Sequence, residues 1–208
     1  MRVAAILVAG AALVCVSTTG ADAQLVTLWN ELGGYNGNVM ASNNFGPGNA
    51  FNSDVADDFV VPAGVTWHIR RVLVRGQYSS GGSAASSVNV FFYNDAGGQP
   101  GSLASQCLNL TGLGFAVGNF NVPLTVCTPV MPDLTGGTSG THYWVEVQAN
   151  ITTPNSGFWL WDNRNTTLGY VPEFQNPGGG FGTGCTVWMS ELLCGGGGTD
   201  HRFRLRGY

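Results

Sequence analysis

Four aspartates are the residues of this chain whose chemistry could hold a metal ion. They are Asp54, Asp57, Asp58 and Asp95. The first three lie just before the apolar run at residues 59–61, and the fourth lies in a turn that contains glycine. Carboxylate oxygens on loops suit calcium, because calcium is a hard cation that prefers oxygen ligands. Aspartates at the start of a strand also accept hydrogen bonds from nearby backbone amides, so a structural role is the other hypothesis that we keep.

Three tryptophans carry the prediction of a ligand-binding surface. Trp159 and Trp161 are two residues apart, so in a strand their indoles share one face and lie about 7 Å apart. If Phe158 and Leu160 face the core, both indoles stand on the outer face, where Trp144 would extend the patch. Exposed aromatic rings can stack on sugar rings, and they commonly anchor interfaces. The alternative hypothesis is that a loop covers these rings.

The sequence contains no recognisable catalytic motif. It has no G-x-S-x-G nucleophile elbow, no H-E-x-x-H zinc motif, no P-loop and no G-x-G-x-x-G. It also contains no lysine, which excludes a Schiff-base lysine. The three histidines, His68, His142 and His201, lie in or beside expected strands, where we expect structural roles. Asp200 precedes His201, so a triad assembled in space stays open, but we expect that the protein is not an enzyme.

Cysteine spacing predicts two disulfide bonds. Beyond the first 23 residues the chain has four cysteines, and an even number in an exported chain indicates disulfides. Three pairings are open, and we predict the pairing of nearest neighbours, Cys107 with Cys127 and Cys185 with Cys194. A zinc site is the alternative, but the sequence has no C-x-x-C pair and few histidines.

The N-terminus predicts export from the cytoplasm. A basic residue precedes a long apolar run at residues 3–16, and a small-x-small cleavage site ends at Ala23. This pattern is typical of a secretory signal peptide, here over residues 1–23. Cys15 leaves a lipoprotein as the alternative. We therefore expect a secreted or periplasmic protein whose remaining residues, 24–208, form one domain without a membrane span.

Composition excludes some partners. The 208 residues carry a net charge of −4 and only 10% are charged, so the chain offers no basic surface to nucleic acid. Hydrophobic residues make up 44% of the chain, which is enough apolar side chain to build a core and to exclude a disordered chain. The 32 glycines follow no collagen period and therefore indicate turns.

Short alternating segments predict an all-β fold. In residues 88–93, 143–149 and 202–206, the inward and outward positions alternate with the period of two that is typical of antiparallel sheets. Turn residues separate about ten such segments, which indicates an antiparallel β-sandwich resembling a jelly roll and stapled by disulfides. Residues 33–48 and 177–184 are expected as loops. The other candidate strands are residues 26–30, 55–61, 66–75, 119–126, 158–161, 168–171 and 186–189.

One candidate strand predicts a β-bulge. Trp67 and Ile69 share one face of this strand. The next apolar pair, Val72 and Val74, has the opposite parity. One extra residue near Arg70 would restore the register, and a bulge inserts one such residue.

Four segments carry a resemblance to a known group of proteins. They are residues 56–67 (ADDFVVPAGVTW), 90–101 (VFFYNDAGGQPG), 143–145 (YWV) and 203–207 (FRLRG). The pattern resembles a broad group of bacterial exported β-sandwich domains, many of which carry a C-terminal anchor of the PEP-CTERM or a similar kind. The resemblance implies a β-sandwich of largely unknown function, with no catalytic residue to carry over. Since the chain ends at Tyr208, directly after its last expected strand, the resemblance implies a freely exported module.

Two functions from different classes are expected, with a third behind them. The first is a non-catalytic extracellular module that binds a polysaccharide through Trp144, Trp159 and Trp161. The second is a structural protein of the envelope or matrix that assembles with copies of itself through the same apolar face. The third is a secreted hydrolase. No cofactor is expected apart from calcium.

Overall fold

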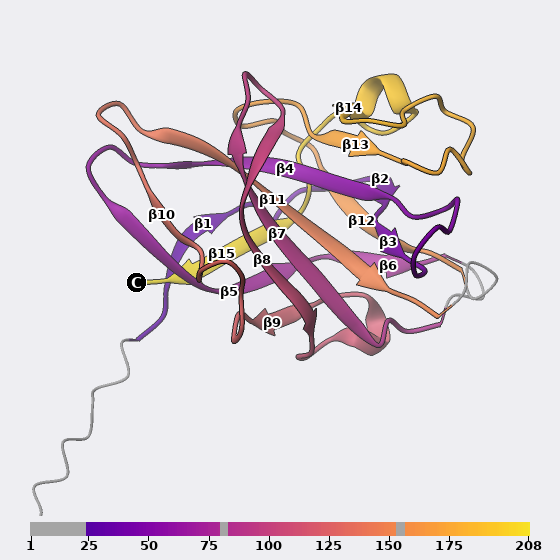
Figure 1. Ribbon diagram of the computed structural model, residues 1–208, viewed down its shortest axis with the longest axis horizontal. Helices are drawn as coiled ribbons and strands as arrows, with labels where there is room; N and C mark the ends of the chain where they lie inside the picture. Colours follow the sequence, from indigo (N-terminus) through magenta and orange to yellow (C-terminus); the bar gives the residue numbers. More distant parts are fainter. Residues whose placement is uncertain (1–23, 80–82, 153–156) are drawn as a thin grey trace, which may run out of the picture.

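The computed structural model describes residues 24–79, 83–152 and 157–208. The expected signal peptide at residues 1–23 lies outside these described residues. Fifteen strands and short 3-10 turns form the regular structure of the described part, without an α-helix (Figure 1). This composition of elements confirms the all-β prediction.

The larger sheet has seven strands in the order β14-β13-β4-β11-β7-β8, with β3 beside β11. All its neighbours are antiparallel except β3, which pairs parallel with β11. The strands are β3 (Asn43–Asn44), β4 (Asp54–Val61), β7 (Ser87–Asp95), β8 (Pro100–Leu110), β11 (Thr141–Asn150), β13 (Glu173–Gln175) and β14 (Met189–Ser190). The long strands β4 and β11 lie at the centre of this sheet.

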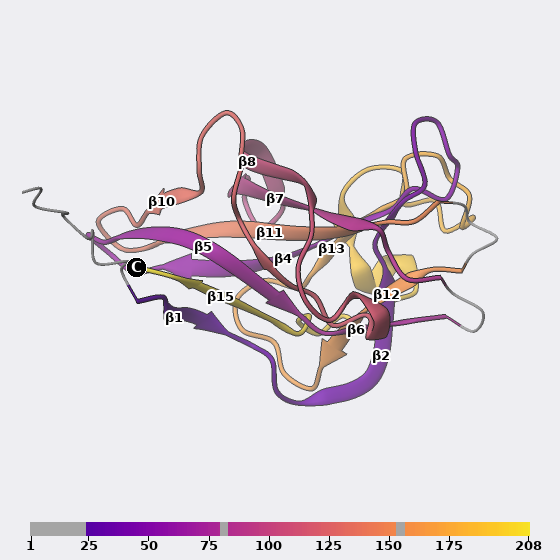
Figure 2. The ribbon, with the colours of Figure 1, turned by 90° about the horizontal axis from the view of Figure 1, so that it is seen from below.

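A five-stranded sheet forms the second layer, and a three-stranded sheet lies at one end. The five strands are β1 (Val26–Asn30), β15 (Phe203–Gly207), β5 (Thr66–Val74), β10 (Asp133–Thr135) and β9 (Asn121–Pro123). The three strands are β2 (Tyr35–Ala41), β12 (Trp159–Arg164) and β6 (Gly76–Tyr78). Figure 2 shows β7, β8 and β11 in one layer and β1, β5 and β15 in the other, which is a sandwich-like arrangement.

Phe59 lies at the centre of the core between the two larger sheets. Its ring stacks on Trp67 and on Tyr143, with centroid distances of 6.2 and 6.1 Å, and meets the edge of Phe92 at 6.3 Å. Branched and aromatic side chains from both layers surround this cluster and are fully buried. Each such side chain stabilises the fold by roughly 1.5–3 kcal/mol when it leaves water, so the core is the main source of stability.

The β-bulge in β5 is confirmed. Arg206 of β15 pairs with Arg71, whereas the next residue, Gly207, pairs with Ile69, so Arg70 is the extra residue. The buried positions shift parity at this point, as the apolar pattern predicted. The bulge therefore keeps the apolar side chains on both sides of it directed into the core.

Several expected boundaries differ from the structure. Residues 33–48, expected as a loop, contain β2 and β3, and the eleven-residue strand β8 was not expected. β8 pairs with β7 through three register shifts, and these interruptions hide its alternation in the sequence. Residues 168–171 form no strand, and the neighbouring pairing begins at Glu173.

Both disulfides are confirmed with the predicted pairing. Cys107 is bonded to Cys127, which ties β8 to the segment after β9, and Cys185 is bonded to Cys194. The two bonds close loops with sequence separations of 20 and 9 residues. Because a cross-link restricts the unfolded chain, the longer loop gives the larger stabilisation.

Replacing Cys107 and Cys127 together by serine should lower the free energy of unfolding by about 3 kcal/mol, because the unfolded chain regains the freedom of the longer loop. The matched double variant at Cys185 and Cys194 should lose slightly less, about 2.5 kcal/mol. Urea denaturation followed by circular dichroism measures both values. Equal stability of the first double variant and the parent would show that the cross-link does not stabilise the fold.

Candidate functional site

The outer face of the larger sheet carries polar side chains near its centre. Side chains alternate along β4 and β11, so the residues between the core positions point outward. On this face Asp54 of β4 lies beside Glu146 and Gln148 of β11. It also pairs in register with Gln175 of β13. Three adjacent strands thus bring two carboxyl groups and two carboxamides together.

The two carboxyl groups of Asp54 and Glu146 form a hydrogen-bonded pair. Tyr93 donates its hydroxyl to Oε2 of Glu146 at 2.6 Å. Gln148 donates to Oδ1 of Asp54 at 2.5 Å, and Gln175 donates to Oδ2 at 2.8 Å. Asp54 therefore accepts hydrogen bonds on both oxygens, which favours its charged form over that of its neighbour.

Burial raises the pKa of both carboxyl groups of the pair. The pKa of Glu146 lies well above its ordinary value because of burial, and the adjacent Asp54 raises it further. The pKa of Asp54 is also raised by burial, but the hydrogen bonds from Gln175 and Glu146 partly offset this. Two carboxylates in contact oppose each other's ionisation, so the two groups titrate as a pair.

A pocket with a volume of about 460 Å³ opens beside Asp54. Its walls come from the loop before β4, the end of β11 and the loop after β13. The lining residues are Gly48, Asn49, Asn52, Asp54, Gln148, Pro177 and Gly178. One carboxylate and three carboxamides therefore line a single cavity. The carboxamides of Asn52 and Gln148 are hydrogen-bonded within the protein through both oxygen and nitrogen, so the acceptor is Asp54 and the donor is the amide group of Asn49.

Asn176 holds the two loops of this pocket together. Its amide group donates to the carbonyl oxygens of Ala50 at 2.7 Å and of Asn52 at 2.6 Å. Gly178 lies so close to Ala50 that an added Cβ would come within 2.5 Å of the Ala50 Cα atom. The close approach of the loops therefore requires glycine at this position.

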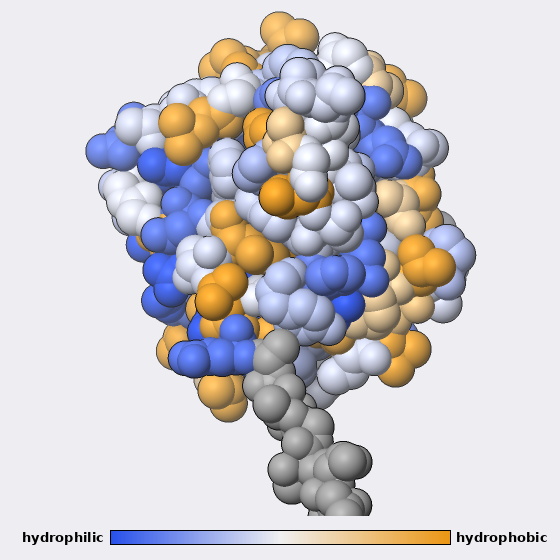
Figure 3. All heavy atoms as spheres, turned by 90° about the vertical axis from the view of Figure 1, so that its left-hand side faces the viewer, coloured by the Kyte–Doolittle hydropathy of each residue, from blue (hydrophilic) through white to orange (hydrophobic). Residues whose placement is uncertain are grey.

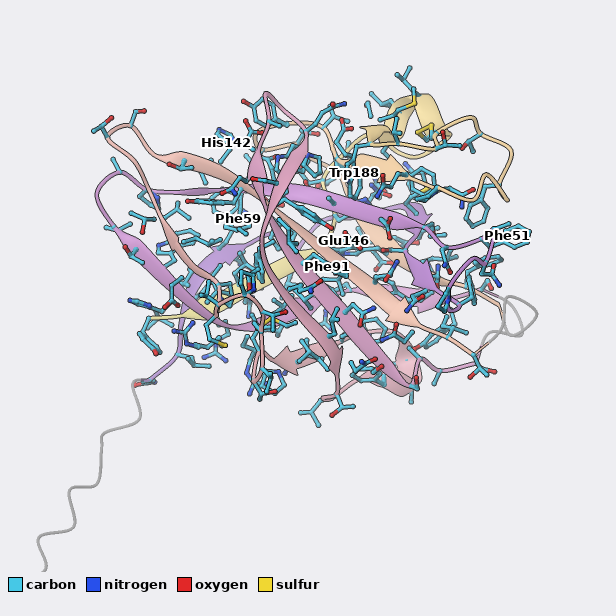
Figure 4. All side chains as sticks on the ribbon, viewed as in Figure 1. Phe51, Phe59, Phe91, His142, Glu146 and Trp188 are labelled. Carbon is cyan, nitrogen blue, oxygen red and sulfur yellow. A yellow bond between two sulfur atoms is a disulfide. The ribbon has the colours of Figure 1, made fainter. Side chains whose placement is uncertain are left out.

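A row of three aromatic side chains lies on the same outer face. Tyr93 is stacked on Phe91 at a centroid distance of 6.3 Å and meets Trp188 edge-on at 6.0 Å. All three side chains are partly exposed. The hydrogen bond from Tyr93 to Glu146 connects this aromatic row to the carboxyl pair, and Figure 4 shows Phe91, Glu146 and Trp188 in one part of the sheet.

Trp159 and Trp161 lie in the core, so the prediction of an exposed tryptophan surface is wrong. Both side chains are 0% exposed. They share one face of β12 as expected, but this face points inward, whereas Phe158 is partly buried at the edge of the core. The indole of Trp159 donates to the carbonyl of Gly118 at 2.8 Å, and that of Trp161 donates to the carbonyl of Arg202 at 3.2 Å. The prediction that the two indoles share one face of the strand is therefore confirmed, and the prediction that this face is exposed is wrong.

Trp144 lies on the outer face of β11, but a loop covers it. Its exposure is 0%, and Tyr170 stacks on it at a centroid distance of 6.0 Å. The Trp144 indole donates to Oδ1 of Asp95 at 3.0 Å. The hypothesis of a covering loop is thus confirmed for Trp144, and the residue that covers it is Tyr170.

The four aspartates do not converge, which removes the geometric basis of the calcium hypothesis. Asp54 lines the pocket, whereas Asp57 points into the interior and accepts the backbone NH of His201 at 2.6 Å. Asp58 contacts a histidine on the outer face. Asp95 accepts the backbone amides of its own turn. Within the three described ranges, no group of three or more His, Cys, Asp or Glu side chains could hold a metal ion.

The histidines pair with carboxylates in three separate places. His142 Nδ1 lies 2.7 Å from Oδ2 of Asp58. This is the geometry of a base and its orienting acid, but among the described residues no hydroxyl or thiol is hydrogen-bonded to His142. His201 is fully buried against Glu191 at 2.8 Å rather than against Asp200. No catalytic triad is therefore assembled in the described part of the chain.

A buried acid cluster, made of Glu31, Asp57 and Asp200, lies in the interior near Arg164. Nη1 of Arg164 is 3.6 Å from Oε1 of Glu31 and 4.0 Å from Oδ2 of Asp200. Oε2 of Glu31 and Oδ1 of Asp200 are buried without a hydrogen-bond partner. Burial, helped by the charge of Asp200, raises the pKa of Glu31 to about 8. Burial also raises the pKa of Asp200 to about 6.

The cluster makes stability depend on pH. A folded-state pKa above the unfolded value means that the folded protein binds more protons, so stability falls as pH rises. For Glu31 the window extends from its ordinary value of 4.5 to about 8. The free energy of unfolding should therefore decrease between these two values.

Glu31→Gln should flatten this decrease by roughly 1 kcal/mol per pH unit, because the uncharged amide cannot ionise. Urea denaturation at a series of pH values measures the slope. Asp133→Asn is the control. The neighbouring Arg70 and His68 lower the pKa of Asp133 below its ordinary value, so this group changes the free energy of unfolding only at pH values below the range in which Glu31 acts. An unchanged slope in Glu31→Gln would contradict the assignment.

Sequence reasoning missed the carboxyl pair, the pocket and the aromatic row. A signal for part of them was present, because Glu146 and Gln148 alternate with the buried Val145 and Val147 in β11. Polar residues at the outward positions of a central strand indicate the face that lies away from the core. The loop residue Asn49 carries no such signal, because two loops far apart in the chain form the pocket.

None of the helices in the described part of the chain is long and apolar enough to cross a membrane. Comparison with protein-family models, with curated proteins and with solved structures gave no match to this chain. The resemblance to bacterial exported β-sandwich domains therefore stays a prediction, and function has to be argued from the site.

Proposed function

We propose that this domain is a binding module that takes an extracellular polysaccharide in the pocket on the outer face of the larger sheet. The observation that carries this proposal is the chemistry of the pocket. Its volume of about 460 Å³ is lined by a carboxylate, three carboxamides and two glycines. Sugars present hydroxyl groups that both donate and accept hydrogen bonds, and this lining offers partners for both.

The aromatic row supports the proposal. Phe91, Tyr93 and Trp188 take the role that the sequence predicted for the buried tryptophans. Their rings are partly exposed and lie on the same outer face as the pocket. Aromatic rings stack on the apolar faces of sugar rings, so a chain that extends from the pocket over the sheet would find contacts along its length.

A second pocket suits a sugar less well. It has a volume of about 250 Å³. Its lining residues are Met40, Ala41, Phe174, Phe181, Thr183 and Cys194. The side chains are mainly apolar, so sugar hydroxyls placed there would lose hydrogen bonds to water without replacement.

Self-assembly, the alternative function, has less support than it had from the sequence. It depended on an exposed apolar face formed by tryptophans that are in fact buried. On the end of the molecule that Figure 3 shows, hydrophobic and hydrophilic residues are interspersed.

The two disulfides support an extracellular site of action, because such bonds persist in oxidising compartments.

Binding of a polysaccharide should change tryptophan fluorescence through Trp188, which is partly exposed in the aromatic row. Titration of the protein with a panel of soluble glycans measures this change. Trp188→Phe should lose most of the response. The matched control Trp29→Phe removes a partly exposed indole of the other sheet and should keep the response.

Phe91→Ala and Asn49→Ala should each weaken binding about tenfold, by removing a stacking surface and a hydrogen-bonding group, which corresponds to about 1.4 kcal/mol. Isothermal titration with the responding glycan measures the affinities. The proposal fails if no glycan in the panel binds. Concentration-dependent oligomers in sedimentation, without glycan binding, would favour self-assembly instead.

A further inference from the structure

Among the described residues, no arginine or histidine forms an ion pair with Asp54. The sequence contains no lysine. A carboxylate that lines a pocket without a cationic partner attracts a cation from the ligand.

Asp54 also has hydrogen-bonding capacity left for a ligand. A carboxylate offers about four lone-pair directions. Three are used by Gln148, Gln175 and Glu146. One acceptor direction therefore stays open at the residue that faces the cavity, and a charged donor makes the stronger hydrogen bond there.

The contact between Asp54 and Glu146 disfavours two negative charges on the pair. Glu146 is almost fully buried, and burial and the neighbouring Asp54 raise its pKa well above the ordinary value. The pair therefore favours a single negative charge over two. A single charge matches one monovalent cationic group, and among the described residues no group of three or more His, Cys, Asp or Glu side chains could hold a metal ion at this pocket.

A carboxamide near Asp54 can hydrogen-bond to a hydroxyl group of the ligand that lies close to its cationic group. Asn49 uses its side-chain oxygen to accept the backbone NH of Phe51 at 2.9 Å, which leaves its amide group for a ligand. A ligand that fits this set carries hydroxyl groups and one ammonium group on a small ring. A 2-amino sugar without an acyl group on its nitrogen has this chemistry.

We propose that the pocket selects polysaccharides that contain free amino sugars, with the sugar ammonium group bound by Asp54. This inference rests on the proposed polysaccharide-binding function and names the ligand class of the same site. Acylation of the nitrogen removes the positive charge, so the acylated polymer binds without the charge-assisted contact.

The test compares a tetramer of glucosamine with a tetramer of N-acetylglucosamine by isothermal titration. The titration is made at about pH 6, because a mildly acidic solution keeps most of the sugar amines protonated. The glucosamine tetramer should bind the parent protein about tenfold more tightly, or by about 1.4 kcal/mol. Tetralysine is the third probe, and it should bind more weakly than the glucosamine tetramer because it lacks hydroxyl groups.

Two variants test the role of the Asp54 charge. Asp54→Asn should bring the affinity ratio of the two sugar tetramers close to one. Asp133→Asn removes a charge elsewhere on the surface and should keep the ratio, which excludes non-specific attraction. Thermal unfolding followed by circular dichroism confirms that each variant is folded.

Three results would overturn the inference. The first is equal binding of the two sugar tetramers to the parent, which would leave polysaccharide binding itself intact. The second is a preference that survives in Asp54→Asn. The third is tetralysine binding as tightly as the glucosamine tetramer, which would assign the pocket to a basic peptide. Absence of binding by every glycan, by contrast, would reject the proposed function as a whole.

Discussion

The alternation of side chains along β4 decides where the charges of this domain lie. Asp54 and Asp58 point to the outer face, whereas Asp57, between them, points to the interior. Since successive side chains of a strand face opposite sides, three acids of one short segment cannot share a ligand. The same constraint places Val55 and Phe59 in the core. A shift of β4 by one residue would exchange these sets and destroy both the core and the pocket.

On the outer face, the same alternation positions the side chains of the pocket. β11 lies beside β4 and presents Glu146 and Gln148 at the level of Asp54, while its valines fill the core. The rigid sheet therefore fixes the carboxyl pair, and only the two loops that complete the pocket depend on tight local packing. Binding sites built on central strands are precise because neighbouring strands lock each side chain in position.

Much of the fold could be predicted from the sequence, because the patterns that indicate strands, turns and disulfides involve residues close together in the chain. The parity change around Arg70 predicted the bulge, and an even number of cysteines in nearby pairs predicted the disulfides. The candidate site could not be predicted in the same way. A period of two tells which residues share a face but not which face is buried, so Trp159 and Trp161 were placed on the wrong side. The pocket could not be predicted because it is formed by loops that are far apart in the chain. The strand β8 could not be predicted because its register shifts interrupt the alternation of apolar and polar residues.

Entry of the ligand into the pocket beside Asp54 is tested most directly by side-chain amide signals in a two-dimensional nitrogen–proton NMR spectrum. During titration with the glucosamine tetramer, the amide signals of Asn49 and Gln148 should shift and saturate with the same affinity as the calorimetric titration. The amide of Asn121 in the other sheet should stay unchanged. Saturable binding that leaves the Asn49 and Gln148 signals in place would contradict the account, because the ligand would then occupy another surface.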